Sequence, residues 1–429
     1  MRVDPAAAHS LGEFIDRSPT QFHAVATAVQ MLRQSGFQEF DPSEPSASGR
    51  AYYQTGGVLI AWVDGASPDR PGRYIAAHTD SPNLRIRPRP DMVTAGISQL
   101  GVEVYGGALL NSWLDRDLGL AGRITVRESS TSTGSGSAVR DILWRCDAPL
   151  LRVPQLAIHL DREIGDRGLV LDRQRHMTPI WGIPDGKGVP FGAWIAEQID
   201  VEPGDVLAWD LACFDFQNHS IIGADGEFLC AARLDNLTSC FAGLDALIEV
   251  AEDSERPTFL MLFDHEEVGS ATSWGADSSL PSRVLELRAS ALGIERQSWL
   301  RALGSSVLLS ADMAHATHPN YPERHEPSHH IALGGGPAIK YNSNERYATS
   351  STTAGLFKSV CADAGIAVQE YSHRGDMACG STIGPLLASQ LGIPTVDVGA
   401  PQLSMHSARE MMAVADVQML NASFAAWYR

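Results

Sequence analysis

The stretch Leu262-Phe-Asp-His-Glu-Glu-Val-Gly-Ser270 ends an apolar run that begins at Phe259. The run closes abruptly in four polar residues, 264–267. A short apolar run bounded by polar residues predicts a buried strand whose carboxyl end opens into a pocket. Ligands of open α/β sheets bind at that end. The stretch therefore predicts an α/β fold with a functional site just after residue 263.

Glu266 and Glu267 are adjacent carboxylates, and an extended segment would point them in different directions. One could ligate a metal ion while the other moves a proton. The alternative is an exposed acidic turn after a strand, which is ordinary when it stands alone. Whether other predicted strands also end in metal-binding residue types decides between these interpretations.

The composition is that of a soluble globular protein, with 44% hydrophobic and 20% charged residues. At 429 residues the chain is too long for one average core, so we expect two domains. A formal net charge of −18 excludes nucleic acid and anionic membrane as expected partners, because both require a basic surface.

The N-terminal residues lack the long apolar core of a signal peptide. No run approaches the roughly 18 apolar residues of a membrane span. We therefore expect a cytoplasmic protein. Its six cysteines are scattered and include no CxxC pair, which favours buried thiols over disulfides or a zinc-thiolate site. Any metal ion must then be held by His, Asp and Glu.

The first part of the chain predicts scaffold and one candidate ligand. Ser18-Pro-Thr20 precedes a helical spacing of apolar residues that ends before Gly36, and residues 52–54 and 58–63 predict two strands of a hairpin. A further short strand, 74–77, stops at His78-Thr-Asp80. The imidazole of His78 could bind a metal ion while Asp80 holds or orients it. Alone, this would be an ordinary histidine beside a turn aspartate.

Between residues 95 and 228 short predicted strands alternate with Gly and Pro, and helical patterns are few. The tract Ser129 to Ala138 predicts a polar, flexible surface loop. We therefore predict a β-rich domain, 95–228, inserted into a mixed-sheet α/β domain formed by residues 1–94 and 229–429.

Further candidate ligands follow predicted elements in the second α/β segment. Asp235 opens a helical pattern, where its ordinary use is an N-cap. Asp312 follows a predicted strand at 306–309, and His406 follows another at 394–398. Each is unremarkable singly, but together with His78 and the Glu pair they indicate one site at a sheet edge. This recurrence favours the metal-binding interpretation.

Two histidines and several carboxylates without cysteine suit two divalent ions of the zinc, cobalt or manganese kind. Such ions, about 3.5–4 Å apart, can share a bridging water and polarise a substrate carbonyl. One carboxylate must bridge the ions, and one unligated carboxylate must take the proton of the water and pass it to the leaving amine. The candidate set offers a group for each task.

The sequence resembles the M18 family of metallopeptidases, of the aspartyl aminopeptidase type, over essentially its whole length. The matching motifs occur in the family's order: 18–25, 78–82, 111–118, 154–160, 264–270, 310–315, 336–340 and 405–406. The resemblance implies that His78 and Asp312 hold one ion, Glu267 and His406 the other, and that Asp235 bridges them. It also implies that Glu266 is the general base on the bridging water and that Asp80 supports His78.

The resemblance further implies that the insertion is a dimerisation domain and that His159 reaches the partner's active site. Some descriptions of the family make this histidine a metal ligand instead. By itself, a histidine in Leu156-Ala-Ile-His-Leu160 would be expected in the core. The family typically assembles dimers into a tetrahedral dodecamer, which implies a homo-oligomer that admits short peptides.

Selection of an acidic N-terminal residue requires a local cation, because the overall charge repels an acidic peptide. Lys340 matches the family's substrate-binding lysine, and His315 and Tyr347 match other substrate-binding positions. Without the resemblance, Lys340 would be expected on the surface. We also expect residues 373–382, before a predicted helix, to contribute backbone N–H groups to the same site.

The leading hypothesis is thus a dinuclear aminopeptidase that removes unblocked acidic N-terminal residues. One alternative is a related dinuclear aminopeptidase or deacylase without acidic preference. Another, from a different class, is a non-catalytic binding or assembly protein with a structural metal ion, although such a site needs no free carboxylate beside its ligands.

Overall fold

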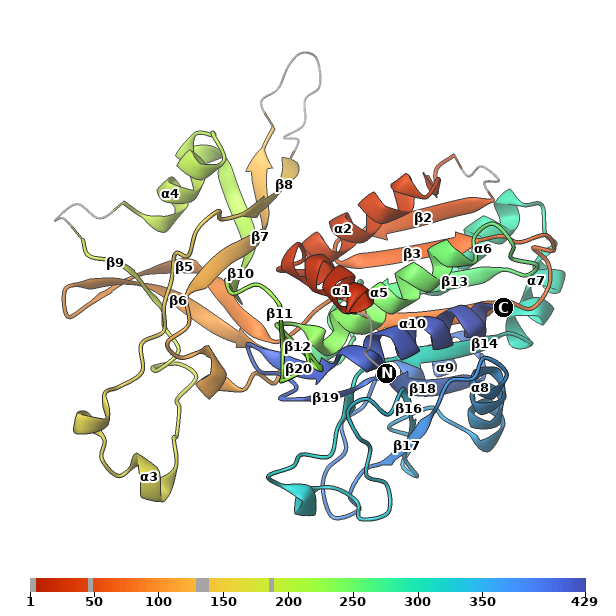
Figure 1. Ribbon diagram of the computed structural model, residues 1–429. Helices are drawn as coiled ribbons and strands as arrows, with labels where there is room; N and C mark the ends of the chain where they lie inside the picture. The colour runs from red at the N-terminus through yellow and green to blue at the C-terminus, as the bar shows by residue number, and fades with distance from the viewer. Residues whose placement is uncertain (1–4, 45–48, 129–138, 185–188) are drawn as a thin grey trace. The chain divides into compact units, whose positions relative to one another are not determined.

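A computed structural model describes residues 5–44, 49–128, 139–184 and 189–429 (Figure 1). The loop predicted at 129–138 lies outside the described residues. The chain forms two compact units. The first comprises Met1–Ser81, His219–Met405 and Glu410–Arg429, and the second comprises Pro82–Asn218 and His406–Arg409.

The first unit is built on a mixed sheet that has nine strands among the described residues. In spatial order they are β1 (Gln38–Glu39), β2 (Arg50–Thr55), β3 (Val58–Val63), β13 (Thr258–Phe263), β4 (Arg73–His78), β14 (Val307–Ala311), β18 (Thr395–Gly399), β16 (Ala338–Tyr341) and β17 (Gln369–Ser372). β13 runs antiparallel to β3 and parallel to β4, and β14 and β18 continue the parallel direction.

The apolar run at 259–263 is continuous because β13 is buried on both faces of the sheet. Leu260 and Leu262 belong to one hydrophobic core, whereas Phe259, Met261 and Phe263 belong to the core on the opposite face. Alternating side chains of a strand point to opposite faces, so the five apolar residues of β13 are divided between the two cores. The predicted buried strand is confirmed.

Helices cover both faces of this sheet. On one face lie α1 (Ala6–Asp16), α2 (Gln21–Gln34), α5 (Leu234–Glu249), α8 (Ser351–Asp363) and α10 (Val414–Tyr428). On the other lie α6 (Leu280–Ala291), α7 (Arg296–Gly304) and α9 (Gly384–Leu391). In Figure 1, α5 and α10 run in front of the central strands. The arrangement is a three-layer α/β/α sandwich.

A smaller sheet of the first unit has five strands in the described residues. Their order is β11 (Ser220–Ile222), β12 (Phe228–Ala231), β20 (Glu410–Ala413), β19 (Pro401–Leu403) and β15 (Ala314–His315). β15 continues the chain that leaves β14, and β19 continues the chain that leaves β18. The small sheet therefore anchors the segments that follow the carboxyl ends of two central strands.

The second unit is β-rich and antiparallel. Its strands, in spatial order, are β8 (Val139–Arg145), β7 (Leu118–Arg127), β10 (Val206–Asp215), β5 (Asn83–Thr94), β6 (Ile97–Tyr105) and β9 (Ile180–Gly182). Its helices α3 (Ile164–Arg167) and α4 (Phe191–Gln198) are short, and single 3-10 turns lie at Leu110–Trp113, Ile158–Leu160 and Pro203–Asp205. It has a hydrophobic core of its own.

The predicted fold class is confirmed: a mixed-sheet α/β unit is interrupted in sequence by a β-rich one. The predicted first helix is α2, and the predicted hairpin is β2 and β3. Among the helices of the described ranges, none is long and apolar enough to cross a lipid bilayer.

Candidate metal centre

Three neighbouring parallel strands deliver acidic and imidazole side chains to one edge of the large sheet. β4 ends at His78, β13 ends just before the polar stretch at 264, and β14 ends just before Asp312. Because β13, β4 and β14 are parallel neighbours, their carboxyl ends meet at the same edge. The recurrence of polar strand ends in the sequence reflects this shared edge.

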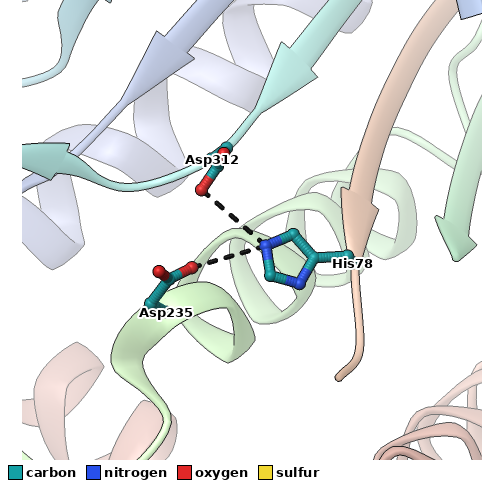
Figure 2. Close-up of side chains that lie close together, drawn as sticks. All are labelled: His78, Asp235 and Asp312. Atoms are coloured by element: carbon teal, nitrogen blue, oxygen red, sulfur yellow. Dashed lines mark ion pairs between the residues drawn. The ribbon is translucent and has the colours of Figure 1, made fainter. Parts of the chain in front are cut away.

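His78 is the centre of the cluster and is only 1% exposed. Figure 2 shows Asp235 and Asp312 converging on its imidazole from two other elements. Nε2 of His78 lies 3.4 Å from Oδ1 of Asp235 and 3.8 Å from Oδ1 of Asp312. Nδ1 lies 3.0 Å from the backbone oxygen of Asp80. An Nδ1–H donated to that carbonyl leaves the Nε2 lone pair facing the carboxylates, as a metal ligand requires.

Asp235 is held by its backbone rather than used as a helix cap. The N-cap of α5 is Arg233, and Asp235 has non-helical φ and ψ of −80° and 107°. Its N–H donates to Oε2 of Glu410 at 3.0 Å, and its carbonyl accepts the hydroxyl of Ser81 at 2.7 Å. The ordinary N-cap interpretation of Asp235 is wrong, because the side chain faces His78.

Glu266 and Glu267 do not lie on an extended segment, as the sequence analysis expected. They open a 3-10 turn, Glu266–Val268, after His265 adopts a left-handed backbone with φ of 64°. The carboxylate of Asp80 accepts both of their backbone N–H groups, at 3.1 Å each. The chain reverses sharply after β13, and Asp80 stabilises the reversal.

Asp80 therefore connects the two halves of the cluster. Besides these two N–H groups, its Oδ1 lies 3.4 Å from Nδ1 of His78. The side chain is 1% exposed. A buried carboxylate that accepts two backbone donors and contacts an imidazole fixes the relative placement of His78 and the Glu pair.

The cluster is strongly acidic, and the pKa values of its members show it. Burial raises the pKa of Glu266 to about 8; the charge of His78 opposes this, and those of Asp312, Asp80 and Asp235 add to it. Burial acts to lower the pKa of His78, but hydrogen bonding to Asp235, Asp312 and Asp80 raises it well above the usual range. The carboxylates thus outweigh burial at His78, whereas burial is the main cause of the shift at Glu266.

The donor set fits divalent cations. His78, Asp235 and Asp312 offer ligand atoms that all lie within 4.8 Å of one another, and so do His78, Glu266 and Glu267. Nitrogen and oxygen donors without sulfur suit zinc, cobalt or manganese. Carboxylates gathered this closely repel one another unless cations compensate them.

Two predicted site residues belong to the second unit. His406 is one of them; its Nδ1 lies 3.2 Å from the carbonyl of Gly107 in the same unit. Its role as a ligand stays a prediction. His159 lies in the exposed 3-10 turn Ile158–Leu160, so the expectation that this histidine lies in a core is wrong.

The predicted substrate-binding residues lie in the first unit. Lys340 on β16 is 2% exposed, so the expectation of a surface lysine is wrong. Its Nζ donates to the carbonyl of Met313 at 2.9 Å and lies 3.6 Å from Oδ2 of Asp312. The ring of Tyr347 is 5.3 Å from the same Nζ, and His315 at the end of β15 is exposed. Lys340 thus contacts, through Asp312, the candidate metal-binding cluster that His78, Asp235 and Asp312 form.

The segment 373–382 precedes a helix as expected, and a contribution of its backbone N–H groups to substrate binding stays a prediction. α9 begins only at Gly384, and Cys379 packs against the small core that contains Tyr347 and Tyr371.

Two buried acids beside the site were not predicted from the sequence. Glu410 on β20 is 2% exposed and holds the backbone of Asp235. Asp397 on β18 is fully buried. Each is a single acid inside an apolar strand pattern, Glu410-Met-Met-Ala413 and Thr395-Val-Asp-Val-Gly399. That pattern is a usable signal, because a buried acid requires dedicated partners.

A mixed α/β architecture with nitrogen and oxygen ligands at the strand ends places the protein in the class of metal-dependent α/β enzymes. Residues 14–428 match the family described as Aminopeptidase I zinc metalloprotease (M18). A Mycobacterium leprae protein named "Probable M18 family aminopeptidase 2" is 49% identical over 428 residues, which cover 99% of each chain. The chain belongs to the M18 family, and it is a metallo-aminopeptidase.

Solved structures of other proteins have a fold similar to that of this chain. The chain is similar to one in a cryo-EM structure of the Ape4 and Nbr1 complex, with 33% identity, a TM-score of 0.92 and coverage of 99% of this chain and 85% of that one. It is similar to the S. cerevesiae mApe1 dodecamer, with 28% identity, a TM-score of 0.83 and coverage of 99% and 96%. The predicted family is confirmed.

Proposed function

We propose that the protein is a dinuclear aminopeptidase that removes unblocked Asp or Glu from the N-terminus of short peptides, with Glu266 as the general base. The observation that supports it most directly is a half-buried carboxylate, Glu266, set beside a His78–Asp235–Asp312 cluster that contacts a buried lysine. A structural metal site needs neither this extra carboxylate nor the lysine.

The residues proposed to hold the metal ions are divided as follows. His78 and Asp312 would hold one ion, Glu267 and His406 would hold the other, and Asp235 would be shared by both. Zinc is the proposed metal, with cobalt or manganese as substitutes. Bound divalent ions supply stabilisation of the carbonyl oxygen and a lowered pKa for the attacking water. Glu266 then accepts the proton of that water and passes it to the leaving amine.

Glu266 suits this task because of where its side chain lies. Oε2 is 3.9 Å from Nε2 of His78, and the side chain is 17% exposed, so it borders the cluster and remains accessible to a substrate. Asp80 holds its backbone N–H. A base whose position is held in this way can serve the attack and the departure of the amine without moving far.

The experiment is a comparison of Glu266→Gln with the wild-type protein. The amide keeps the size of the side chain but cannot accept the proton, so we expect kcat to fall by about three orders of magnitude. Two metal ions per chain should remain bound. The control is Glu286→Gln, an exposed glutamate of α6 that pairs with Arg296. Retained activity with both ions bound would remove Glu266 from the role.

The proposed acidic specificity depends on Lys340. Its buried ammonium lies beside Asp312 and under the ring of Tyr347, which places a fixed cation next to the metal-binding cluster. A rate panel across N-terminal residues tests this, together with Lys340→Met. Faster release of Leu than of Asp by the wild-type enzyme would contradict the specificity.

One observation favours the alternative of an aminopeptidase or deacylase without acidic preference. The charge of Lys340 is already compensated in part by Asp312, and its Nζ donates to a backbone carbonyl. A substrate carboxylate must compete with these groups. The same rate panel, extended to an N-acylated amino acid, separates the two functions.

We propose that the protein is a homo-oligomer, in which the β-rich unit forms the dimer contact, His159 acts at the partner's site and the dimers form a tetrahedral dodecamer. Leu156, Ile158 and Leu160 flank His159 and are 59%, 55% and 74% exposed. A run of exposed apolar side chains is typical of a surface that a partner covers. Mixing inactive His159→Ala and Glu266→Gln proteins should restore part of the activity, once subunit exchange is shown.

We propose a cytoplasmic location. None of the six cysteines, all of which lie in the described ranges, forms a disulfide, which suits a reducing compartment. Fractionation of cells, with activity measured in each fraction, tests this.

A further inference from the structure

Asp397 lies directly beside Lys340 in the large sheet. β16 and β18 are antiparallel, with Ile339 opposite Val398. Lys340 follows Ile339 and Asp397 precedes Val398, so the same register sets Lys340 opposite Asp397. Side chains opposite each other in an antiparallel pair share a face of the sheet. Asp397 is fully buried there, and the positive charge of Lys340 acts on it.

The hydrogen bonds of Asp397 are those of an ionised carboxylate. Its Oδ2 accepts the backbone N–H of Ala348 at 2.6 Å, and its Oδ1 lies 2.6 Å from Oγ1 of Thr382. Thr382 Oγ1 itself accepts the N–H of Gly384 at 3.2 Å, so the threonine hydrogen is available to Asp397. Burial raises the pKa of Asp397, and its hydrogen bonds together with Lys340 oppose that shift.

These contacts tie two segments to β18 next to Lys340. The N–H of Asp397 donates to Oγ1 of Thr349 at 2.9 Å, so residues 348 and 349 are both attached to this one aspartate. The segment they hold begins at Tyr347, whose ring covers the Lys340 ammonium. The second segment contains Thr382 and Gly384. A Cβ at residue 384 would come within 2.5 Å of the Asp397 carboxylate, so this segment can lie so close to β18 only because residue 384 is glycine.

Lys340 therefore has acidic groups on two sides. Oδ2 of Asp312, in the candidate metal-binding cluster, lies 3.6 Å from Nζ of Lys340. Asp397 lies on β18 of the large sheet. Neither the metal-binding cluster nor the proposed proton transfer uses Asp397. Its negative charge reduces the attraction that Lys340 exerts on an approaching substrate carboxylate.

We propose that Asp397 is a positioning residue that sets the strength of charge selection: it holds the Tyr347 segment against Lys340 and, by its buried charge, moderates the preference for acidic N-terminal residues. This inference rests on the proposed role of Lys340 in substrate binding. It adds a residue that touches neither the metal-binding cluster nor the scissile bond.

The decisive variant is Asp397→Asn, because it removes the charge and can keep both side-chain contacts. Its amide oxygen can accept from Ala348, and its NH₂ can donate to Oγ1 of Thr382. We measure kcat and KM for two peptides that differ only in N-terminal Asp or Ala. The ratio of their kcat/KM values should rise about five-fold, the size expected for two like charges roughly 8 Å apart at an effective dielectric constant of about 40.

Two further variants separate charge from position. Thr382→Val keeps the charge of Asp397 and removes the hydroxyl that donates to Asp397 and accepts from Gly384. It should therefore lower kcat/KM for both peptides and leave their ratio unchanged. The control Asp245→Asn changes a half-buried aspartate of α5 that accepts from Asn421, remote in sequence from Lys340, and should leave both values near wild type. If Asp397→Asn does not fold, Asp397→Ser carries the same change of charge.

An unchanged or lower ratio in a folded, charge-neutral variant overturns the inference while leaving the proposed function intact. A wild-type enzyme without acidic preference would instead refute the proposed specificity and this inference with it. A higher ratio, mainly through a lower KM for the Asp peptide, supports it.

Discussion

Replacing Asp80 by Asn is the most informative perturbation of the candidate site. The substitution keeps the shape of the side chain and removes its charge. In the wild-type protein the carboxylate accepts the N–H groups of Glu266 and Glu267 and contacts Nδ1 of His78. An asparagine has one oxygen, so its NH₂ group must face one of the two N–H donors.

The magnitude follows from that loss. A hydrogen bond to a charged group contributes about 1.5–3 kcal/mol, and a buried donor without a partner carries a similar penalty. If this free energy is lost in the placement of Glu266 or Glu267, kcat/KM should fall roughly 10- to 100-fold, since about 1.4 kcal/mol corresponds to a factor of ten. Binding of metal ions should weaken by a similar factor, because His78 keeps its bond to the backbone carbonyl of residue 80 but loses the negative charge beside Nδ1.

The assay measures kcat/KM on a peptide with N-terminal Asp at saturating zinc, together with metal content after dialysis against a weak chelator. Asp245→Asn serves as the matched control. If Asp80→Asn keeps kcat/KM within about two-fold of wild type and retains its metal ions, then Asp80 does not place the Glu pair, and the reasoning from its two N–H contacts fails.

Four other outcomes are expected. Chelation should abolish activity and lower Tm, and added zinc should restore both, because ions bound only to the native state stabilise it; a Tm that does not move would contradict this. Gly57→Ala should cost about 1–3 kcal/mol of unfolding free energy by denaturant titration, because the new Cβ would lie 2.4 Å from Oδ2 of Asp264, whereas Gly49→Ala, with open space around it, should be neutral. Burial and neighbouring histidines lower the pKa of His325, so the stability that is present above about pH 6.5 should be lost as pH falls through the pKa of the folded state. His325→Asn should make the unfolding free energy from urea titrations depend less on pH in this range. Burial raises the pKa of Asp416 to about 7, so its contribution to stability should be complete below about pH 4 and lost as pH rises through 7. An Asp416→Asn protein whose unfolding free energy depends on pH as that of the wild type does would refute this.

Local pattern was sufficient for the elements of the scaffold. The apolar run at 259–263 specifies a strand buried on both faces, and the turn glycines at 56 and 57 specify the β2–β3 hairpin. Because parallel strands end at a common edge, the polar residues after β4, β13 and β14 can be grouped into one site from the sequence alone. His78, Asp235, Asp312 and the Glu pair do converge.

Only the tertiary structure decided which of these side chains are buried and what holds them. The double contact of Asp80 with the Glu pair joins residues 186 and 187 positions apart, and the contact of Glu410 with Asp235 spans 175. Local sequence carries no information about such separations. The 3-10 turn at Glu266 likewise depends on these distant acceptors.

Lys340 and His159 show most clearly the difference between what local sequence predicts and what tertiary packing decides. Sequence pattern alone favoured a surface lysine and a core histidine, and the structure has the reverse. Burial of Lys340 follows from its place on an inner strand beside Asp397 and Asp312, and exposure of His159 follows from a turn outside any sheet. Residue type thus determined the kind of chemistry available, while the packing of distant strands determined which charges meet, because burial depends on neighbours that the chain supplies from far away.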